Sequence, residues 1–383
     1  MGISNSFNND DLSAKPRIVI ASVLKPVDDP RALARMANSL SQANKYDLHI
    51  IGFKTKKVPT VEGITFHPIH DFPRLSFKRT LASIKFLRKL IQLKPQLVIV
   101  NTHEYLIVSS INRILFGTPT LYDVQENYFR NLWYTNTFPI GIKHLLAIYV
   151  RSKEWLTKPF VDHYLLAERG YDHELRFHRP NFTIIENKYA GLANNISKNK
   201  PSSTLQLIIT GTLAEHYGLF EAIQFVKNIS NHTPVHLTLV GYCPKKAVLN
   251  RLLSTINGDS RFSLVGGAEW VPHDTLIKYI HSSDAAIIAY PVHPATENCL
   301  PTKVFEYLAL QIPFFITPHP YWLRYCEAYK AAIPVDFHQT DQSEAVKCLQ
   351  KGVFYPKGAP KEVFWPSEGS KLLQVVHQIL DSK

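Results

Sequence analysis

Short apolar runs alternate with amphipathic segments along almost the whole chain, and this alternation restricts the fold more than any other feature. Six runs in the first half are suited to strands buried on both faces, at 17–24, 46–53, 95–102, 118–126, 163–168 and 182–188. Helical spacing fills most of the intervals between them, at 29–42, 74–93, 104–115 and 139–158. Strands that alternate with helices in this way predict a mostly parallel, doubly wound sheet.

The same pattern starts again after a small polar segment. Residues 190–203 have the composition of a linker, and further strands are predicted at 204–211, 235–241, 261–266, 285–291 and 313–318. A chain of 383 residues is also too long for one core. We therefore expect an N-terminal domain at 1–189, a linker at 190–203, a C-terminal domain at 204–365, and a helix at 366–383 that can return to the N-terminal domain. The fold class is α/β, with two Rossmann-like doubly wound domains facing each other across a cleft.

The net charge of +12 is concentrated in the first half of the chain. Residues 1–180 contain 25 Lys and Arg against 15 Asp and Glu, which favours an anionic partner for this half. The four cysteines form no C-x-x-C pair, so neither a disulfide framework nor a zinc site is expected. The polar N-terminus is unlike a signal peptide, and no apolar run has the length of a membrane span, so we expect a cytoplasmic protein.

The segment NCLPTKVFEYLALQIP (298–313) carries a chemical signal. It follows the predicted strand at 285–291, so a helix should begin near Pro301 or Thr302, with its free N–H groups at the carboxyl end of the sheet. An anion is expected there, and Lys303 adds a full positive charge. Glu306 is suited to neutral hydroxyls such as those of a ribose. A diphosphate next to a ribose indicates a nucleotide-sugar, whereas the alternative is a dipole-stabilising Glu306 and a solvated Lys303.

These residues resemble the donor-site signature of the GT-B glycosyltransferases, in particular the retaining group called family 4. The matching positions are Pro301, Lys303, Glu306, Tyr307, Ala309 and Pro313, and Gln311 stands where Gly is usual. Further blocks resemble the family in the same order along nearly the whole chain: DDPRALARMANSLSQ, YDVQENY, ENK, TGTLAEHYGLFEAI and EWVPHDTLIKYIHSSDAAIIAYP. Two departures stand out, because the family has Glu at the position of Asn298 and a phosphate-binding Lys at the position of Tyr217.

The resemblance implies a set of site residues in each domain. Donor-binding residues would be Gly211, Thr212, His216, Trp270, Val271, Leu300, Pro301, Lys303 and Glu306. Catalytic candidates would be His103, Glu126, Glu297 and Asn298, with Glu104 as the alternative to His103. Trp270 could equally be a core residue. If the reaction inverts the sugar, His103, Glu104 or Glu126 could serve as general base, whereas a retaining front-face reaction needs none.

The resemblance further implies a glycosyltransferase that moves a sugar from a UDP- or GDP-linked donor to an acceptor hydroxyl. The acceptor would be a glycan or lipid-linked glycan in surface polysaccharide or lipopolysaccharide synthesis. No D-x-D metal motif is evident on the donor side, so no obligatory cofactor is expected. Two alternatives remain: a nucleotide-sugar epimerase on the same fold, and a catalytically degenerate GT-B binding or scaffold protein, which Asn298 and Tyr217 favour.

The segment 74–94 is a cationic amphipathic helix. It contains seven basic residues and no acidic one, with Lys78, Lys85, Arg88 and Lys89 among them. Its apolar stripe is formed by Leu81, Ile84, Leu87 and Ile91. Such a helix can lie on an anionic membrane, here the inner face of the plasma membrane, or its stripe can pack on the sheet with the cations in water. Nucleic acid is a poorer partner, because no recognised binding motif accompanies the charge.

Overall fold

The structure is a computed structural model that describes residues 15–73, 76, 78–135, 137–178, 180–192, 203–358 and 360–382. Two compact units make up the chain, and each is described by itself. Unit 1 contains the residues up to 186 together with those from 368 onward, and unit 2 contains residues 187–367. The boundary falls at Glu186 and Asn187, just before the predicted linker, of which residues 193–202 lie outside the described part of the chain.

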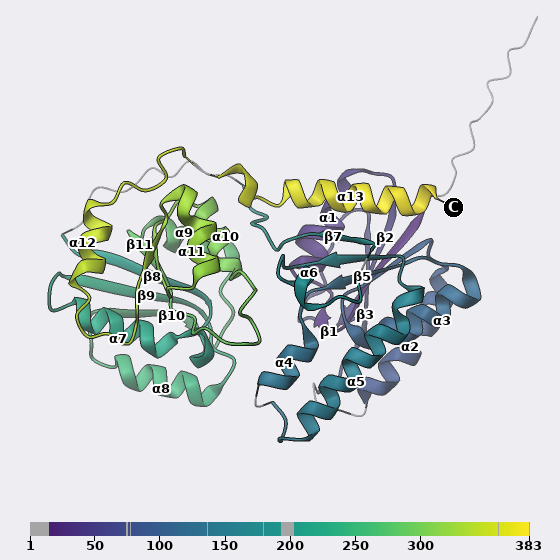
Figure 1. The fold of residues 1–383 in the computed structure, drawn as a ribbon, viewed down its shortest axis with the longest axis horizontal. Helices are drawn as coiled ribbons and strands as arrows, with labels where there is room; N and C mark the ends of the chain where they lie inside the picture. Colours follow the sequence, from purple (N-terminus) through teal and green to yellow (C-terminus); the bar gives the residue numbers. More distant parts are fainter. Residues whose placement is uncertain are drawn as a thin grey trace, which may run out of the picture. The chain divides into compact units, whose positions relative to one another are not determined.

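Unit 1 is built on a parallel sheet of seven strands in the order β3-β2-β1-β4-β5-β6-β7 (Figure 1). Its strands are β1 (Arg17–Pro26), β2 (Asp47–Phe53), β3 (Ile64–His70), β4 (Leu97–Val100), β5 (Thr120–Val124), β6 (His163–Leu166) and β7 (Phe182–Ile184). The central strands are almost entirely buried and mostly apolar, because helices cover both faces of a parallel sheet.

The helical segments of unit 1 connect successive strands. A π-helical turn (Arg31–Ala37) leads into α1 (Asn38–Gln42), and the other helices are α2 (Lys78–Leu93), α3 (Leu106–Phe116), α4 (Tyr128–Tyr134), α5 (Ile142–Thr157), α6 (Tyr171–Glu174) and α13 (Pro366–Asp381). Short 3₁₀ turns at His103–Tyr105 and Lys158–Phe160 precede α3 and follow α5. In Figure 1, α2, α3 and α5 lie side by side, and α2 contacts α3 while α3 contacts α5.

The last helix, α13, belongs to unit 1 although unit 2 separates the two in the sequence. Its buried Glu368 carboxylate accepts a hydrogen bond from the Glu186 amide at 3.0 Å. Lys371 pairs with Glu368 at 2.8 Å and also donates to the Ile184 carbonyl. Glu186 in turn accepts two hydrogen bonds from Arg169, at 2.9 and 3.0 Å. A chain of hydrogen bonds and ion pairs, with both carboxylates buried and both cations partly exposed, therefore holds the end of the polypeptide on β7.

Unit 2 contains a parallel sheet of six strands in the order β10-β9-β8-β11-β12-β13. The strands are β8 (Leu205–Thr212), β9 (Val235–Tyr242), β10 (Phe262–Gly267), β11 (Ala285–Ile288), β12 (Phe314–Ile316) and β13 (Ala332–Pro334). The helices are α7 (Leu219–Ile229), α8 (Lys246–Ile256), α9 (His273–His281), α10 (Thr302–Ala309), α11 (Pro320–Cys326) and α12 (Ser343–Lys351), and 3₁₀ turns lie at Glu215–Tyr217, Glu327–Tyr329 and Lys361–Val363.

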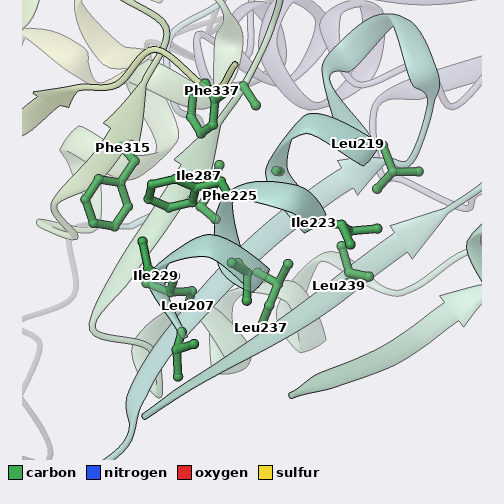
Figure 2. Packing of buried hydrophobic residues seen from close by; sticks show 14 of the residues in the cluster. Leu207, Leu219, Ile223, Phe225, Ile229, Leu237, Leu239, Ile287, Phe315 and Phe337 are labelled. Atoms are coloured by element: carbon green, nitrogen blue, oxygen red, sulfur yellow. The ribbon is translucent and has the colours of Figure 1, made fainter. Parts of the chain in front are cut away.

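Two apolar clusters fill the opposite faces of the unit 2 sheet. Leu207 and Ile287 belong to one cluster, and their neighbours Ile208 and Ile288 belong to the other, because successive strand residues point to opposite faces. Figure 2 shows the first cluster, in which the Phe225 ring lies 5.0 Å from the ring of Phe315. The packing of this core thus determines where the strands end and where the loops that carry the site begin.

Two strands escaped the sequence analysis, and both lie at the edge of a sheet. β3 contains Pro68, and β13 ends on Pro334. Proline cannot donate a hydrogen bond to a neighbouring strand, so it argues against a central strand and is tolerated at an edge. The strand predicted at 285–291 is shorter than expected, because β11 ends at Ile288.

Candidate donor site and polar cluster

Helix α10 begins where the sequence predicts it. Its first residue is Thr302, and Pro301 holds the extended conformation of a cap (φ −55°, ψ 129°). Pro301 provides no side-chain cap for this end, and the first turn contains no acidic residue. The first backbone N–H groups of a helix have no partner within it, so this end of α10 attracts anions.

Lys303 and Glu306 are paired with each other in the structure. Lys303 Nζ lies 2.6 Å from Glu306 Oε2. The other carboxylate oxygen, Oε1, is buried and has no hydrogen-bond partner among the described residues. The sequence analysis missed a third member, His273 at the start of α9, whose Nε2 lies 3.8 Å from this oxygen. An unsatisfied buried carboxylate oxygen is costly, which marks this point as a place for a hydrogen-bond donor.

Gly211 brings the backbone of β8 against the Lys303 side chain. A Cβ atom at residue 211 would lie 3.0 Å from Lys303 Cε, and the φ of +99° is one that side chains disfavour. Gly241 and Gly266 continue the row on β9 and β10, since each is paired in register with the previous glycine. A Cβ on Gly241 would lie 1.7 Å from the Gly211 carbonyl oxygen. Three neighbouring strands therefore end in a strip of bare backbone beside Lys303.

The two added glycines could have been found in the sequence. They occur in LVGY and LVGG, at the ends of two predicted strands, as Gly211 does in IITG. The common signal is a glycine at the carboxyl end of successive strands, where a close approach of backbone is needed. It is visible only once the strands are aligned in register.

Trp270 lies on the surface beside this strip. Its side chain is 74% exposed and stacks on Tyr242, with ring centroids 4.7 Å apart and planes 17° from parallel. The alternative of a core tryptophan is therefore wrong. Its neighbour Val271 packs against the second apolar cluster and lies close to Gly266. An exposed flat ring held on a second ring is suited to stacking against a planar ligand.

The turn from β8 to α7 contains Thr212 and His216, which are both exposed. Although the residue is exposed, partial desolvation of its ring, followed by the charge of Lys245, lowers the pKa of His216. Tyr217 stacks on Tyr290 at 4.7 Å, so an aromatic pair occupies the position where the resembling family has a cation. A small pocket lies between this turn and α10, with Thr212, Tyr217, Tyr290 and Lys303 among its lining residues.

The loop before α10 separates the remaining donor-side candidates. Glu297 is exposed and Asn298 is half-buried. Leu300, by contrast, is buried in the second apolar cluster. The prediction that Leu300 binds a donor is therefore wrong for its side chain, because a core leucine cannot turn outward without leaving a cavity. Its backbone remains the part that can reach a ligand.

His103 lies at the end of β4, in a buried polar cluster rather than on an open surface. Its Nδ1 is 2.7 Å from Lys153 Nζ on α5, and Tyr128 lies edge-on to its ring at 4.6 Å. Burial, followed by the charges of Lys153 and Arg79, lowers the pKa of His103 to about 2. Burial also lowers the pKa of Lys153, but only to about 8, so Lys153 is protonated at neutral pH and donates to His103.

These contacts indicate which nitrogen of His103 carries its proton. Because Nδ1 accepts from Lys153, the neutral ring carries its proton on Nε2, which lies 3.6 Å from Glu104 Oε1. A ring held in this form can donate a hydrogen bond but is a poor base. Glu104 is in turn paired with Arg79. The two predictions that His103 or Glu104 acts as general base are thus disfavoured by electrostatics.

Two segments that carry the family resemblance meet inside unit 1. Arg31 follows β1 and forms a bidentate pair with Asp123 of β5, at 2.9 Å from Nε to Oδ2, and both side chains are buried. Gln125 bonds to Asp123 at 2.7 Å and also accepts from Lys25. Glu126 is exposed and accepts from Asn131 Nδ2 at 3.0 Å. Among the described residues, no three His, Cys, Asp or Glu side chains are grouped as metal ligands.

Solved structures share this architecture over nearly the whole chain. The structure is similar to sucrose-phosphate synthase from Thermosynechococcus elongatus, with 13% identity, 96% of this chain and 100% of that chain covered, and a TM-score of 0.70. It is also similar to HepE from Anabaena in complex with UDP and glucose, with 11% identity, 94% and 99% covered, and a TM-score of 0.62. The chain has the GT-B fold. Starch synthase IV from Arabidopsis thaliana, bound to ADP and acarbose, is a further GT-B neighbour, with 12% identity, 96% and 100% covered, and a TM-score of 0.61.

No protein-family model and no curated protein matches the sequence. The expected α/β class with two parallel sheets is confirmed by the sheets of seven and six strands and by the GT-B neighbours. At identities this low the likeness establishes the fold alone. The chemistry of the site has to be argued from the residues of this chain.

Proposed function

We propose that this GT-B chain is a glycosyltransferase that moves a sugar from a nucleotide-sugar to an acceptor hydroxyl. One observation carries the proposal: Glu306 Oε1 is buried and has no hydrogen-bond partner in the part of the chain that the structure describes, beside Lys303 and one turn from the anion-attracting start of α10. A nucleoside diphosphate supplies what both groups need, since its ribose hydroxyls donate and its phosphates are anionic.

The remaining groups of unit 2 complete the proposed donor site. Trp270 on Tyr242 offers a stacking surface for a UDP or GDP base, next to Val271. The glycine strip allows the diphosphate to lie close to backbone N–H groups, together with Thr212 and His216. Lys303 would exchange its contact with Glu306 for the diphosphate when a donor binds. The bond between the sugar and these phosphates breaks in the reaction. Lys303 and the start of α10 stabilise the negative charge that develops on the phosphates.

The catalytic roles follow from the contacts of each predicted residue. His103 Nε2–H is suited to donate to a sugar hydroxyl. Of the three residues considered as general base, Glu126 presents an exposed carboxylate, so an inverting reaction would use it. Glu297 and Asn298, in the loop before α10, are proposed to contact the donor sugar. The reaction as proposed requires no bound metal ion.

The proposed acceptor is a glycan or lipid-linked glycan, in the synthesis of a surface polysaccharide or lipopolysaccharide. The proposed location is the cytoplasm, at the inner face of the plasma membrane. Support for the pathway comes from the family resemblance, and a lipopolysaccharide outer core galactosyltransferase, WaaB, is among the structural neighbours, with 11% identity and a TM-score of 0.51. Nucleic acid is not a proposed partner.

Calorimetric titration with UDP and GDP tests the proposed donor site. Glu306→Ala should weaken nucleotide binding by about 1–3 kcal/mol, or roughly 5- to 150-fold, because the ribose hydroxyls lose their acceptor. Glu306→Gln keeps an acceptor oxygen and should lose less. Glu344→Ala is the matched control, since it removes a similar Lys–Glu pair at three-residue spacing on exposed α12 and should bind as the wild type does. Equal affinities of the wild type and Glu306→Ala would contradict the assignment.

Product analysis separates the transferase from its alternatives. Incubation of the protein with an acceptor and with a nucleotide-sugar that it binds should release a free nucleoside diphosphate. Recovery of an epimerised nucleotide-sugar would instead identify an epimerase. Absence of nucleotide binding by the wild type would favour the degenerate scaffold protein, for which Tyr217 and Asn298 are the sequence features.

A further inference from the structure

Helix α5 of unit 1 has apolar residues on its exposed side and charged residues among those on its buried side. Its outward residues are Ile142, Leu145, Ile148, Tyr149, Trp155 and Leu156, and all are exposed. Its inward residues include Lys143, Lys153 and Glu154, and all three are buried. A helix that faces water on one side normally has the opposite arrangement. The outward face of α5 is therefore unsuited to water.

The inward contacts of α5 prevent it from rotating to hide its apolar side. Lys143 Nζ donates to the Thr135 carbonyl at 3.2 Å, and Lys153 donates to His103. Glu154 accepts from the Tyr122 hydroxyl at 3.1 Å, and burial raises its pKa to about 7. Breaking these buried contacts would leave polar groups without partners. The chain thus holds the apolar face of α5 outward at a cost in polar burial.

The neighbouring helix α3 extends the same surface. Ile107, Ile111, Ile114, Leu115 and Phe116 are exposed, and their spacing of three, four and seven residues places most of them on one face. Helix α3 contacts α5, and the two helices lie side by side in Figure 1, so we infer that their exposed faces form one surface. We call these outward residues of α5 and α3 the apolar face of unit 1. A contiguous apolar surface of this kind on a folded protein marks an interaction site.

Helix α2 borders this surface with positive charge. Ala82, Phe86, Leu90 and Leu93 are buried, and the Phe86 ring stacks on Tyr105 at 3.9 Å. The alternative that the predicted stripe packs on the sheet is therefore wrong for its main members, because Leu81, Ile84 and Ile91 are exposed. The helix therefore has two apolar sides. The side that carries Phe86 packs inward, and the side that carries Leu81, Ile84 and Ile91 is exposed.

The cations of α2 lie beside these exposed apolar residues. Lys85 and Arg88 are exposed, Lys89 is half-buried and donates to Gln92 at 3.1 Å, and the side chain of Lys78 lies outside the described part of the chain. The sequences of α2, α3 and α5 contain a single acidic residue, Glu154, and its side chain is buried. The outward surface of the three helices thus combines apolar and cationic groups without an anion.

We propose that the apolar face of unit 1, with the cations of α2, docks on the surface of an anionic phospholipid bilayer. Helices that lie in a membrane interface place apolar side chains among the acyl chains and cations among the headgroups. A protein partner would match such a surface only by being both apolar and acidic. No helix in the described part of the chain has the length and apolarity to cross a bilayer. The proposal uses unit 1 alone and does not depend on the donor chemistry of unit 2.

Vesicle flotation with the full chain tests the proposal. The wild type should float with phosphatidylcholine vesicles in which about a third of the lipid is phosphatidylglycerol, and more weakly with phosphatidylcholine alone. The triple variant Leu145→Ser, Ile148→Ser, Leu156→Ser should lose at least about tenfold in partitioning. Lys85→Gln with Arg88→Gln should lose about 30-fold on the anionic vesicles and little on the neutral ones.

Matched controls come from exposed positions of unit 2. Leu253→Ser with Val353→Ser, and Lys347→Gln with Lys351→Gln, should float as the wild type does. Quenching by brominated phosphatidylglycerol gives an independent readout on folded protein. Trp155→Phe should reduce the quenching, whereas Trp270→Phe should not, although both tryptophans are exposed.

Three results would overturn the proposal. The first is a wild type that binds neither kind of vesicle. The second is a triple α5 variant that floats unchanged. The third is a wild-type dimer, seen by light scattering, that does not float and becomes a monomer in the α5 variant. That result would assign the apolar face to a second copy of the chain.

Discussion

The two units share an architecture but differ in where they place their charges. Eight of the Asp, Glu, Lys and Arg residues described in unit 1 are buried, namely Arg31, Asp123, Lys143, Lys153, Glu154, Glu168, Glu186 and Glu368, against Lys188 and Glu306 in unit 2. Exposed large apolar side chains show the same bias toward unit 1. Along α5, unit 1 therefore buries charged side chains and exposes apolar ones. The described residues of unit 2 show no such reversal.

This difference shows what a buried charge indicates in each unit. In unit 1, buried charges come in pairs and chains, such as Arg31 with Asp123, and they fix how strands, turns and helices are joined. In unit 2, Glu306 Oε2 pairs with Lys303, and Oε1 has no hydrogen-bond partner among the described residues, as is also true of Glu154 Oε2 in unit 1. It is the position of Glu306 beside Lys303 and near the start of α10 that supports our proposal of a ligand. The same observation supports a structural role in one unit and a functional role in the other.

Removal of a buried partner should have the largest effect. Asp123→Ala leaves the Arg31 guanidinium buried without its carboxylate, so the free energy of unfolding should fall by about 3–5 kcal/mol. Asp259→Ala in unit 2 removes a partly exposed pair with Arg261 and should cost less than about 1 kcal/mol. Urea unfolding monitored by hydrogen exchange in each unit measures both. Similar losses in the two variants would end the distinction between the units.

The next largest effect is expected when the pH is lowered, and it depends on His103. Its pKa is about 2 in the folded protein and near 6.5 in an unfolded chain, so its contribution to stability is present above pH 6.5 and is lost as the pH falls. Between about pH 6.5 and 4.5, the wild type should lose about 1.4 kcal/mol per pH unit relative to His103→Gln. The comparison with His103→Gln is needed because Glu154 has the opposite effect in this range. Its raised pKa of about 7 makes the free energy of unfolding increase as the pH falls from about 7 to 4.5.

The measurement is the urea midpoint of unit 1 at a series of pH values. His338→Gln, at an exposed position of unit 2, should keep the wild-type pH dependence. A His103→Gln variant whose stability runs parallel to the wild type would show that His103 is protonated in the folded protein. The assigned role of Lys153 as its hydrogen-bond donor would then be wrong.

Glycine replacement separates backbone strain from site geometry. Gly211→Ala should cost about 1–2 kcal/mol because of its positive φ, and should also weaken UDP or GDP binding by displacing Lys303. Gly117→Ala is the matched control in unit 1, since it also has a positive φ but meets no atom within 4 Å. It should lose stability alone. Unchanged nucleotide affinity in Gly211→Ala would remove the glycine strip from the site.

The smallest effect is expected at Gln311. This residue follows α10 with φ at +51°, where the resembling family has Gly. Gln311→Gly should relieve the strain and raise the free energy of unfolding by about 0.5–1 kcal/mol. Thermal unfolding of unit 2 measures the gain, with nucleotide affinity as the check that α10 has not moved. A loss of stability would mean that a contact of the Gln311 side chain outweighs the strain.

Much of the fold could be predicted because it depends on local pattern. Apolar runs identified nearly all central strands, and the start of α10 at Thr302 followed from a strand, a loop and a proline. The edge strands β3 and β13 could not be predicted, because proline and histidine hide their pattern and pairing on one side is enough to hold them. Lys303 and Glu306 were placed at the right helix end, but their contact with each other was not foreseen.

The sequence by itself determined two parallel α/β sheets, a cationic helix in the first half, and Lys303 with Glu306 at a helix start, because spacing and side-chain chemistry are properties of the chain. Tertiary structure decided which partner each polar group meets. Lys153 beside His103, Arg31 on Asp123 and the three aligned glycines join residues far apart in sequence. It also decided that α5 faces outward with its apolar side, because only packing determines which side of a helix is buried.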